Sequence, residues 1–483
     1  MADNQEKSYA SSFKTVQIAL YKVGQEHLKP FVNLYQGNQG LCTSIQYHED
    51  IFWPCYGATM ILSDSAVNLI AEMPIQGWEK VVLEVEDATE QRYSYEFRIW
   101  GISNRVTQDR KQQYTVGLIS VEGLVNEGVH INRTIKGNTS VAVKELLKKY
   151  LKVPDKLIYS EKSATTIKYL PTKESPFSLI RKIAPKTVSE KVANNIKDRQ
   201  ESEESYSPDE GVTDVDNKEA EKATGTAGYL FFQTRRGFTF KSIDSIVSSG
   251  EDFNGTPPWD KKFFYRRAKI GSPSMYNIQE MIFGSEINMI KQLREGSYNS
   301  VVCFFNINTG EYDERVYRLA DMWKDMAHMG SQDGLALGAK NLSKVPTRVM
   351  SSIINHENWY MDTKVASNET KHGGNGENQF PDWQKNFLSQ GISRSSTLFN
   401  QQLTISLTGH LELCAGDKIE VRIPDNKAES IKDEAWDTES SGTYLIKNLN
   451  HQFLMGPTPS VYTVLELIRD SSGIKDQESN VKT

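Results

Sequence analysis

Two stretches far apart in the chain carry nearly the same strand pattern. GWEKVVLEVED (residues 77–87) and GDKIEVRIPD (residues 416–425) each begin with a turn and continue with an acid, a lysine and apolar side chains at every second position. Alternation of this kind places the apolar side chains on one face of a strand. In the second stretch Pro424 removes the backbone donor that would continue the ladder. Each stretch therefore predicts a strand with one buried face, built from Val81, Leu83 and Val85 in the first and Ile419, Val421 and Ile423 in the second.

The correspondence extends into the strands that follow. Residues 97–105 match residues 444–452 in the placement of apolar side chains, and the tripeptide YTV occurs at 114–116 and again at 462–464. Three matching segments in the same order favour an internal duplication, with one barrel of the same kind near each end of the chain. The alternative is that two unrelated β domains have converged on similar strand patterns, because alternation is common in β proteins.

The pattern along the whole chain predicts a mainly β (α+β) fold, with two related antiparallel β-barrel domains flanking a smaller α+β domain. An irregular insertion interrupts the second barrel. The predicted units are a first barrel at 13–125, an α+β domain at 126–262, a second barrel at 263–320 plus 397–470, the insertion at 321–396 and a flexible C-terminal tail at 471–483.

Within the α+β domain the hydrophobic period changes to that of a helix. Residues 138–151 have apolar side chains at helical spacing behind capping residues, and residues 175–184 start with Ser175 as a cap and Pro176 in the first turn. Residues 228–244 predict a hairpin that turns near Arg236. Beyond this domain, residues 274–293 also predict a helical stretch.

The charge of the chain is unevenly distributed. The net charge of −6 is fully accounted for by eleven acids and five bases between residues 190 and 222, so the remainder is neutral. A neutral body argues against a broad nucleic-acid-binding face. The segment 187–226 has few apolar residues, which predicts a disordered acidic loop, with an acidic docking arm as the alternative.

Signatures of catalysis and of metal binding are missing from the sequence. It has no Gly-rich phosphate loop followed by Lys-Ser/Thr, no G-x-S-x-G elbow and no H-E-x-x-H pair. Its four cysteines are scattered without a C-x-x-C pair, and its eight histidines have no ligand spacing. We expect no catalytic residue, cofactor or metal. No apolar run approaches the length of a membrane span or a signal peptide, so we expect folding in the cytoplasm.

The insertion at 321–396 contains an unusual set of large side chains. Trp323, Met326 and Trp383 are the candidates for contact with a partner protein, because tryptophan and methionine are enriched at interfaces. The alternative is that these side chains pack on their own barrel.

The order of these segments resembles the central baseplate hub protein of T-even-like contractile-tailed phages. The resemblance covers residues 13–470 and rests on SPFSLIRKIA (175–184), GYLFFQTRRGFTF (228–240), GDKIEVRIPD (416–425), SGTYLIKNLNHQF (441–453) and YTVLELIRD (462–470). The acidic loop and the size of the insertion depart from that family, which leaves the partners of those two segments open.

The resemblance implies a structural adaptor without catalysis of its own. It implies a homotrimer whose two barrels per chain form a six-barrel ring, joining the six-fold tail tube to a three-fold membrane-piercing spike. The implied partners are the spike, tube or tube-initiator proteins and baseplate wedge proteins, with no base readout of nucleic acid and no membrane insertion. The implied location is the virion tail baseplate. The alternatives are the hub of a non-phage contractile injection machine and a cell-wall hydrolase.

Overall fold

The computed structural model describes most of the chain. The described residues are 14–27, 29–36, 39–65, 69–87, 90–109, 111–190, 226–248, 261–265, 276–284, 289–306, 310, 312–323, 326–330, 346–354, 359–361, 381–425, 436–456 and 459–473. Most of the acidic segment that the sequence predicts to be disordered lies outside these residues, and so does most of the C-terminal tail.

The fold is mainly β and is dominated by one large, largely antiparallel sheet that runs through both ends of the chain. Its N-terminal strands are β1 (Lys14–Tyr21), β2 (Val32–Gln36), β3 (Gln39–Gly40), β4 (Cys42–Asp50), β5 (Gly57–Asp64), β6 (Lys80–Glu86), β7 (Arg92–Gln108) and β8 (Lys111–Ile119), with the short helix α1 (Leu69–Glu72) between β5 and β6. They are hydrogen bonded in the order β4-β5-β8-β7-β6-β1-β2-β3. Only Leu41 separates β3 from β4, and its N–H donates to the carbonyl of Leu34 on β2 over 2.8 Å. The strands therefore close into a first barrel.

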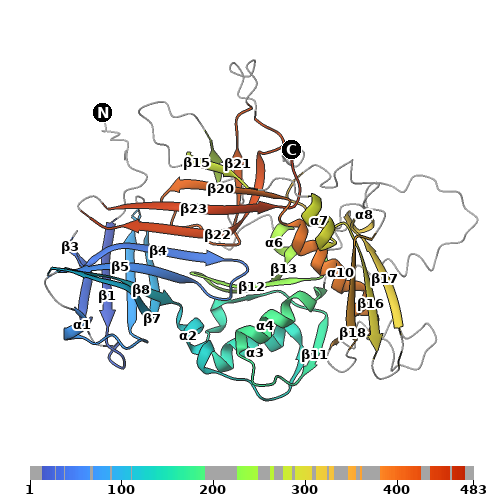
Figure 1. Cartoon of the computed structure of the whole chain (residues 1–483), viewed down its shortest axis with the longest axis horizontal. Coiled ribbons are helices and arrows are strands. Elements are labelled where there is room, and N and C mark those ends of the chain that lie inside the picture. The colour runs from blue at the N-terminus through green and yellow to red at the C-terminus, as the bar shows by residue number, and fades with distance from the viewer. Residues whose placement is uncertain are drawn as a thin grey trace, which may run out of the picture.

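The C-terminal strands form a second closed set. They are β14 (Lys262–Phe264), β15 (Ile278–Phe283), β20 (Gln401–Thr408), β21 (Lys418–Arg422), β22 (Gly442–Leu454) and β23 (Ser460–Arg469), in the order β14-β21-β22-β23-β20-β15. A bridge between Phe264 and Asn277 brings β14 back to the start of β15. Strand β22 also pairs with β4, so the two barrels share one continuous sheet (Figure 1). Their interiors form one hydrophobic cluster that includes Leu83 and Tyr95 from the first barrel and Val421 and Leu465 from the second.

The two barrels agree in register across four strands. In the first, Tyr47, Ala58, Leu118 and Ile99 stand opposite one another on β4, β5, β8 and β7. In the second, the row is Phe283, Leu403, Leu467 and Ile446 on β15, β20, β23 and β22. The two lysines of the repeated motif also correspond, because Lys80 pairs with Arg98 and Lys418 with Leu445, the residues directly before Ile99 and Ile446.

Irregularities of pairing also occur at matching positions. The β7·β8 register shifts between Ile99 and Gly101, and the β22·β23 register shifts between Ile446 and Asn448. The β4·β5 and β15·β20 pairs shift between Cys42 and Ser44 and between Ile278 and Glu280. A bulge leaves one residue unpaired and bends its strand, so unrelated barrels have no reason to share two of them. These matches favour duplication over convergence.

One part of the sequence correspondence is wrong by one residue. Val116 pairs with Ile102, but the residue that pairs with the equivalent Leu449 is Leu465 and not Val464. The two YTV tripeptides therefore face opposite sides of their strands, since a shift of one residue exchanges the faces. Tyr114 is buried inside the first barrel, whereas Tyr462 is only partly buried.

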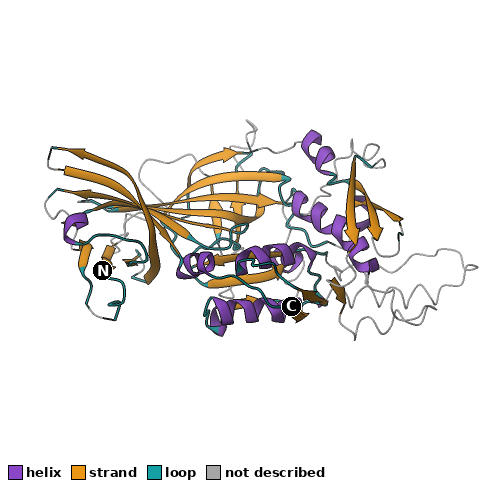
Figure 2. Cartoon of the chain, turned by 60° about the horizontal axis from the view of Figure 1, so that its bottom comes forward, coloured by secondary structure: helices purple, strands orange, loops and turns teal. Residues whose placement is uncertain are grey.

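The α+β region lies along one side of the shared sheet (Figure 2). Its helices are α2 (Val121–Gly128), α3 (Thr139–Tyr150), α4 (Pro176–Ile183) and α6 (Ile243–Ser248), with short 3-10 turns at Asp155–Leu157 and Ala184–Lys186. Its strands are β9 (Ile135–Asn138), β10 (Ile158–Ser160), β11 (Thr165–Tyr169), β12 (Tyr229–Thr234) and β13 (Gly237–Ser242). Asn138 and Ser175 cap α3 and α4 as the sequence predicts. The predicted hairpin is β12 and β13, with Arg235 and Arg236 at its turn.

The region between β15 and β20 forms an inserted unit whose own sheet lies at one end of the molecule (Figure 1), and its residues 359–361 pair with β11 of the α+β region. It contains α7 (Met289–Glu295), β16 (Asn299–Asn306), β17 (Tyr312–Arg318), α8 (Leu319–Met322), β18 (Arg348–Ile354), β19 (Trp359–Met361) and α10 (Pro381–Thr397). Strands β17, β16 and β18 form their own sheet. The prediction that residues 263–320 belong to the second barrel is therefore wrong for β16 and β17, because β16 pairs with β17 and β18, and neither β16 nor β17 pairs with a strand of the barrel among the described residues.

The predicted helix at 274–293 is also corrected in part. Residues 278–283 form β15, which pairs with β20, and among the described residues of the stretch those from Met289 onward are helical, as α7. Pairing across the barrel overrides the helical spacing of these residues. Among the described helices, none is both long enough and apolar enough to cross a membrane.

Candidate functional site

The two barrels meet where β22 runs antiparallel to β4. Residues 448–454 of β22 extend beyond β21 and pair with residues 44–50 of β4 instead. His451 stacks on Tyr47 across this junction, with ring centroids 6.0 Å apart and planes inclined by 13°. The junction joins two equivalent barrels through unlike strands, and it is the candidate functional site.

The acid of each repeated motif closes the turn before its strand. The Glu79 carboxylate accepts hydrogen bonds from the backbone N–H groups of Gln76 (2.7 Å) and Gly77 (2.9 Å), and the Asp417 carboxylate accepts one from the equivalent Cys414 N–H (3.0 Å). Both acids are buried. Buried carboxylates satisfied by backbone donors explain why both copies keep an acid directly before the lysine.

The residue before each acid has a left-handed backbone. Trp78 has φ +77° and Gly416 has φ +87°. In both copies this residue donates its N–H to the middle strand, Trp78 to Ile99 and Gly416 to Ile446. A Cβ at Gly416 would lie 2.8 Å from Phe232 Cζ on β12, so glycine permits the hairpin to approach this turn.

The turn of the β12–β13 hairpin inserts between the two barrels. The Arg236 guanidinium binds Asp417 with Nη1 to Oδ1 at 2.7 Å and Nη2 to Oδ2 at 3.0 Å, and it also donates to the Glu412 carbonyl. The neighbouring Arg235 lies over the rings of Tyr93 and Tyr95 in the first barrel. Adjacent arginines therefore bind opposite barrels, which ties the α+β region to both.

Glu49 lies at the centre of this arrangement, 1% exposed, on the strand of the first barrel that meets the second. Its carboxylate accepts hydrogen bonds from Tyr47 Oη at 2.5 Å, from the Arg235 N–H at 2.6 Å and from the Ala415 N–H at 2.8 Å. Burial raises the pKa of Glu49 above its ordinary value, against the effect of these hydrogen bonds. One side chain thus connects both barrels and the hairpin.

His451 is neutral at this junction. Burial lowers the pKa of His451 to about 3, with the charge of Arg235 acting in the same direction. Its Nδ1 lies 2.9 Å from Thr463 Oγ1. A neutral ring can stack on Tyr47 without bringing a second positive charge beside Arg235.

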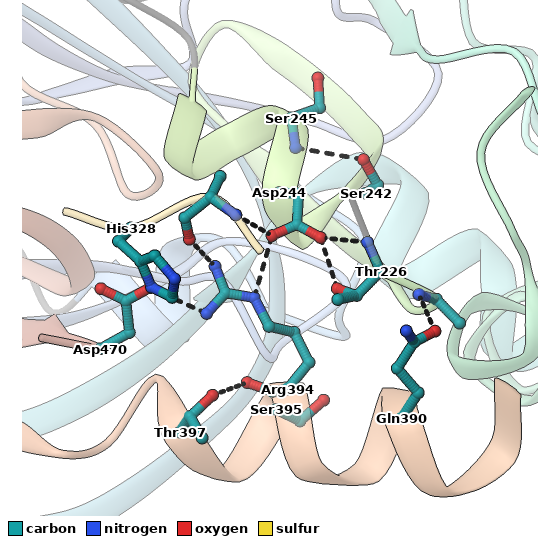
Figure 3. A network of polar contacts seen from close by, with 12 residues as sticks. Thr226, Ser242, Asp244, Ser245, His328, Gln390, Arg394, Ser395, Thr397 and Asp470 are labelled. Carbon is teal, nitrogen blue, oxygen red and sulfur yellow. Dashed lines mark hydrogen bonds and ion pairs between the residues drawn. The ribbon is translucent and has the colours of Figure 1, made fainter. Parts of the chain in front are cut away.

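A second buried polar network, shown in Figure 3, fixes the inserted unit to the second barrel. Arg394 on α10 is fully buried and pairs with Asp470, at the end of β23, over 2.8 Å and with Asp244 on α6 over 3.1 Å. It also donates to the Ala327 carbonyl over 2.6 Å. Burial opposes the charged form of Asp470, but Arg394 and His328 outweigh it and hold the pKa of Asp470 well below its usual range.

Two of the three predicted partner residues, Trp323 and Met326, are buried within this chain. Trp323 and Met326 are buried, 8% and 2% exposed, in a cluster with Tyr298, Tyr317 and Leu319 of their own chain. This packing corresponds to the alternative interpretation of these residues, except that they pack within the inserted unit and not on the barrel. Trp383 lies on α10, but its side chain lies outside the described residues.

No group of three or more His, Cys, Asp and Glu side chains within the described ranges is arranged to hold a metal ion. The cysteines Cys42, Cys55 and Cys414 are buried thiols, and burial raises the pKa of Cys42 to about 12 and that of Cys55 to about 11.

Sequence reasoning missed the residues that join the units, namely Glu49, Arg235, Arg236, Asp244, Arg394 and Asp470. Two features of the sequence pointed toward these residues. One was the acid of the repeated motif, which in the second copy is Asp417, and the other was the Arg-Arg pair at a predicted hairpin turn. The partners of Arg394 are 76 and 150 residues away, so no local pattern reveals them.

Comparison with known proteins finds similarity at the level of solved structures only. No family model matches the chain, and no curated protein matches it by sequence. A tail protein from Neisseria meningitidis MC58 is similar at 11% identity and a TM-score of 0.45, over 95% of this chain and 97% of that one. The 43 kDa tail protein of prophage MuSo2 from Shewanella oneidensis has 11% identity and a TM-score of 0.41, over 94% and 98%. The Francisella PdpA-VgrG complex has 7% identity and a TM-score of 0.41, over 95% and 58%.

Proposed function

We propose that this protein is a structural hub of a contractile phage tail baseplate, a trimeric symmetry adaptor between the six-fold tail tube and a three-fold membrane-piercing spike. The observation that carries the proposal is the duplication itself. One chain contains two barrels that agree in the row of residues through Ile99 and Ile446, in two bulges and in the acid-capped turn. Three such chains present six nearly equivalent barrels while keeping three-fold symmetry.

The junction supports this role mechanically. Glu49, Arg235 and Arg236 join both barrels to the α+β region with buried, hydrogen-bonded charges, so the barrels are held in a fixed relation. An adaptor that matches two symmetries needs such rigid spacing, because each barrel must meet its place on the tube. Closed rings are also the usual outcome for homo-oligomers.

The proposed partners are a second and third copy of this chain, the spike, and tube or tube-initiator proteins, with wedge proteins at the periphery. The motifs in 175–184, 228–240 and 441–453 that resemble the phage family support this choice. We propose that the protein has no catalysis of its own and that it resides in the tail baseplate of the virion after assembly in the host cytoplasm.

Reconstitution with the neighbouring gene products tests the proposal. The purified chain is mixed with the tube protein and the spike, separately and together, and the complexes are weighed by light scattering. The proposal predicts a complex of three copies of this chain with three of the spike, and a complex with both partners in which tube and spike lie on opposite faces. Binding to neither partner would contradict it, and release of peptidoglycan fragments by the purified chain would favour a hydrolase.

A further inference from the structure

The intrachain junction pairs one strand edge of the first barrel with one strand edge of the second. In the first barrel the paired edge is residues 44–50 of β4, and in the second it is residues 448–454 of β22. The equivalent of β4 is β15, and the equivalent of β22 is β7, as the rows through Tyr47 and Phe283 establish. Each barrel therefore contains both kinds of edge, and a single chain uses only half of them.

The unused edges are open in the part of the chain that the structure describes. Strand β6 ends its pairing with β7 at Arg98, so residues 101–108 of β7 pair with β8 alone. Strand β15 pairs with β20 on one side, and on its other side the bridge to β14 lies before its first residue. Open ladders of this kind are templates for pairing with another chain.

Side chains at the intrachain junction are more buried than the equivalent side chains on the open edges. Tyr47 is 1% exposed beneath His451, whereas its equivalent Phe283 is 40% exposed. Leu449 is fully buried at the junction, whereas its equivalent Ile102 is only partly buried. The open edges carry large apolar side chains that the intrachain junction covers elsewhere.

We propose that β15 of one copy pairs antiparallel with residues 103–108 of β7 of a second copy, in the register that β4 and β22 use within the chain, with the further register shift between Ser103 and Val106 forming a bulge. The inference rests on the proposed trimer and specifies its interface. The contact joins unlike surfaces, so it propagates from copy to copy and closes when the ring is complete. The sheet that runs through both barrels then continues around the ring.

The register identifies one decisive pair. Gln452 stands opposite Gln46 within the chain. Val106 on β7 pairs with Gln113 on β8, and Gln452 on β22 pairs with Tyr462 on β23. Because Gln113 and Tyr462 occupy equivalent positions, Val106 is the equivalent of Gln452. By the same comparison of β15 with β4, Ile282 is the equivalent of Gln46. Val106 is 62% exposed and Ile282 is 56% exposed. The intermolecular pairing sets these two apolar side chains against each other, a favourable cross-strand pair.

Cysteine cross-linking tests this pairing on the full chain. Val106→Cys and Ile282→Cys are combined in a Cys303→Ser background, since Cys303 is the one native thiol that is not fully buried in the described residues. Directly opposite strand residues come close enough for a disulfide. We expect oxidation to give covalent trimers from the double variant and none from either single variant. The matched control is Val106→Cys with Ile290→Cys, because Ile290 is equally exposed, at 65%, but lies on α7.

A charge test separates the pairing from effects on folding, since both side chains point to solvent in the single chain. Val106→Lys with Ile282→Lys sets like charges opposite each other, and we expect the trimer to weaken by about fivefold or more per interface. Val106→Lys with Ile282→Glu restores attraction and should recover the trimer. Equal oligomer strength in the two double variants overturns the pairing.

The outcomes distinguish this inference from the proposed function. Trimers that fail to cross-link through 106 and 282 overturn the strand pairing and leave the adaptor intact. A chain that stays monomeric at all concentrations, alone and with the spike, overturns both.

Discussion

Individual buried polar residues fix the relation between the barrels, and His451 makes the stability of the fold depend on pH below neutrality. Its folded-state pKa of about 3 lies below the value of about 6.5 in an unfolded chain. As pH falls, the unfolded state binds a proton first, so stability decreases between about pH 6.5 and pH 3. The slope is at most about 1.4 kcal/mol per pH unit for one group.

We predict that His451→Gln flattens this dependence. Glutamine keeps a hydrogen-bonding group near Thr463 but does not titrate. The thermal unfolding midpoint of the wild type should fall more steeply than that of the variant between pH 6.5 and pH 4.5. Parallel decreases in the two proteins would show that His451 is not the titrating group.

Arg394 is the residue on which the inserted unit depends. Its removal breaks the buried ion pairs to Asp244 and Asp470, and breaking a buried pair typically costs about 3–5 kcal/mol. We predict that Arg394→Met lowers the unfolding midpoint and increases amide exchange in α10 and in residues 326–330. Arg394→Lys keeps the charge without the planar fork and should give an intermediate loss. An unchanged exchange pattern in Arg394→Met would contradict this account.

At the scale of elements, the β12–β13 hairpin acts as a clamp between the barrels. We predict that Arg236→Ala loosens the turn at residues 412–417, because it removes a two-point ion pair to a fully buried Asp417. Breaking such a buried pair costs about 3–5 kcal/mol. Hydrogen exchange should rise in β12, β13 and this turn, while β1 and β6, which do not contact the hairpin turn through these bonds, serve as the internal reference. Uniform exchange across all of them would argue against a clamp.

The elements also show which parts of the fold the sequence could reveal. Alternation at Val81 and Ile419 predicts their strands because period 2 is a local property. The correspondence of Lys80 with Lys418 was visible for the same reason. The shift between the YTV tripeptides was not, because equivalence depends on the pairing partners, Ile102 for Val116 and Leu449 for Leu465, and no local pattern reveals those partners.

Other misses have the same physical origin. Residues 278–283 have helical spacing but form β15 through pairing with β20, more than 100 residues later in the chain. Strands β16 and β17 lie in the range predicted for the second barrel, but their sheet depends on β18, which the sequence did not predict. At the junction, Arg236 and Asp417 are 181 residues apart, so only the folded chain brings them together.

At the scale of the whole molecule, the duplication would let one chain occupy two of the six nearly equivalent positions of the proposed ring. The equivalence is not complete, because β14 pairs parallel with β21, whereas β1 pairs antiparallel with β6. The inserted unit follows β15 in the second barrel, where the first barrel has only residues 51–56 between β4 and β5. These differences are what keep the proposed ring three-fold, and they place the inserted units at three of its six positions.

Single-particle electron microscopy of the purified chain, with and without the neighbouring spike, tests the central claim most directly. The account predicts a ring of three copies with six similar barrel lobes, in which lobes bearing the inserted unit alternate with lobes that lack it. Single chains in both preparations, or a ring in which the two barrels of each chain occupy unlike environments, would contradict it.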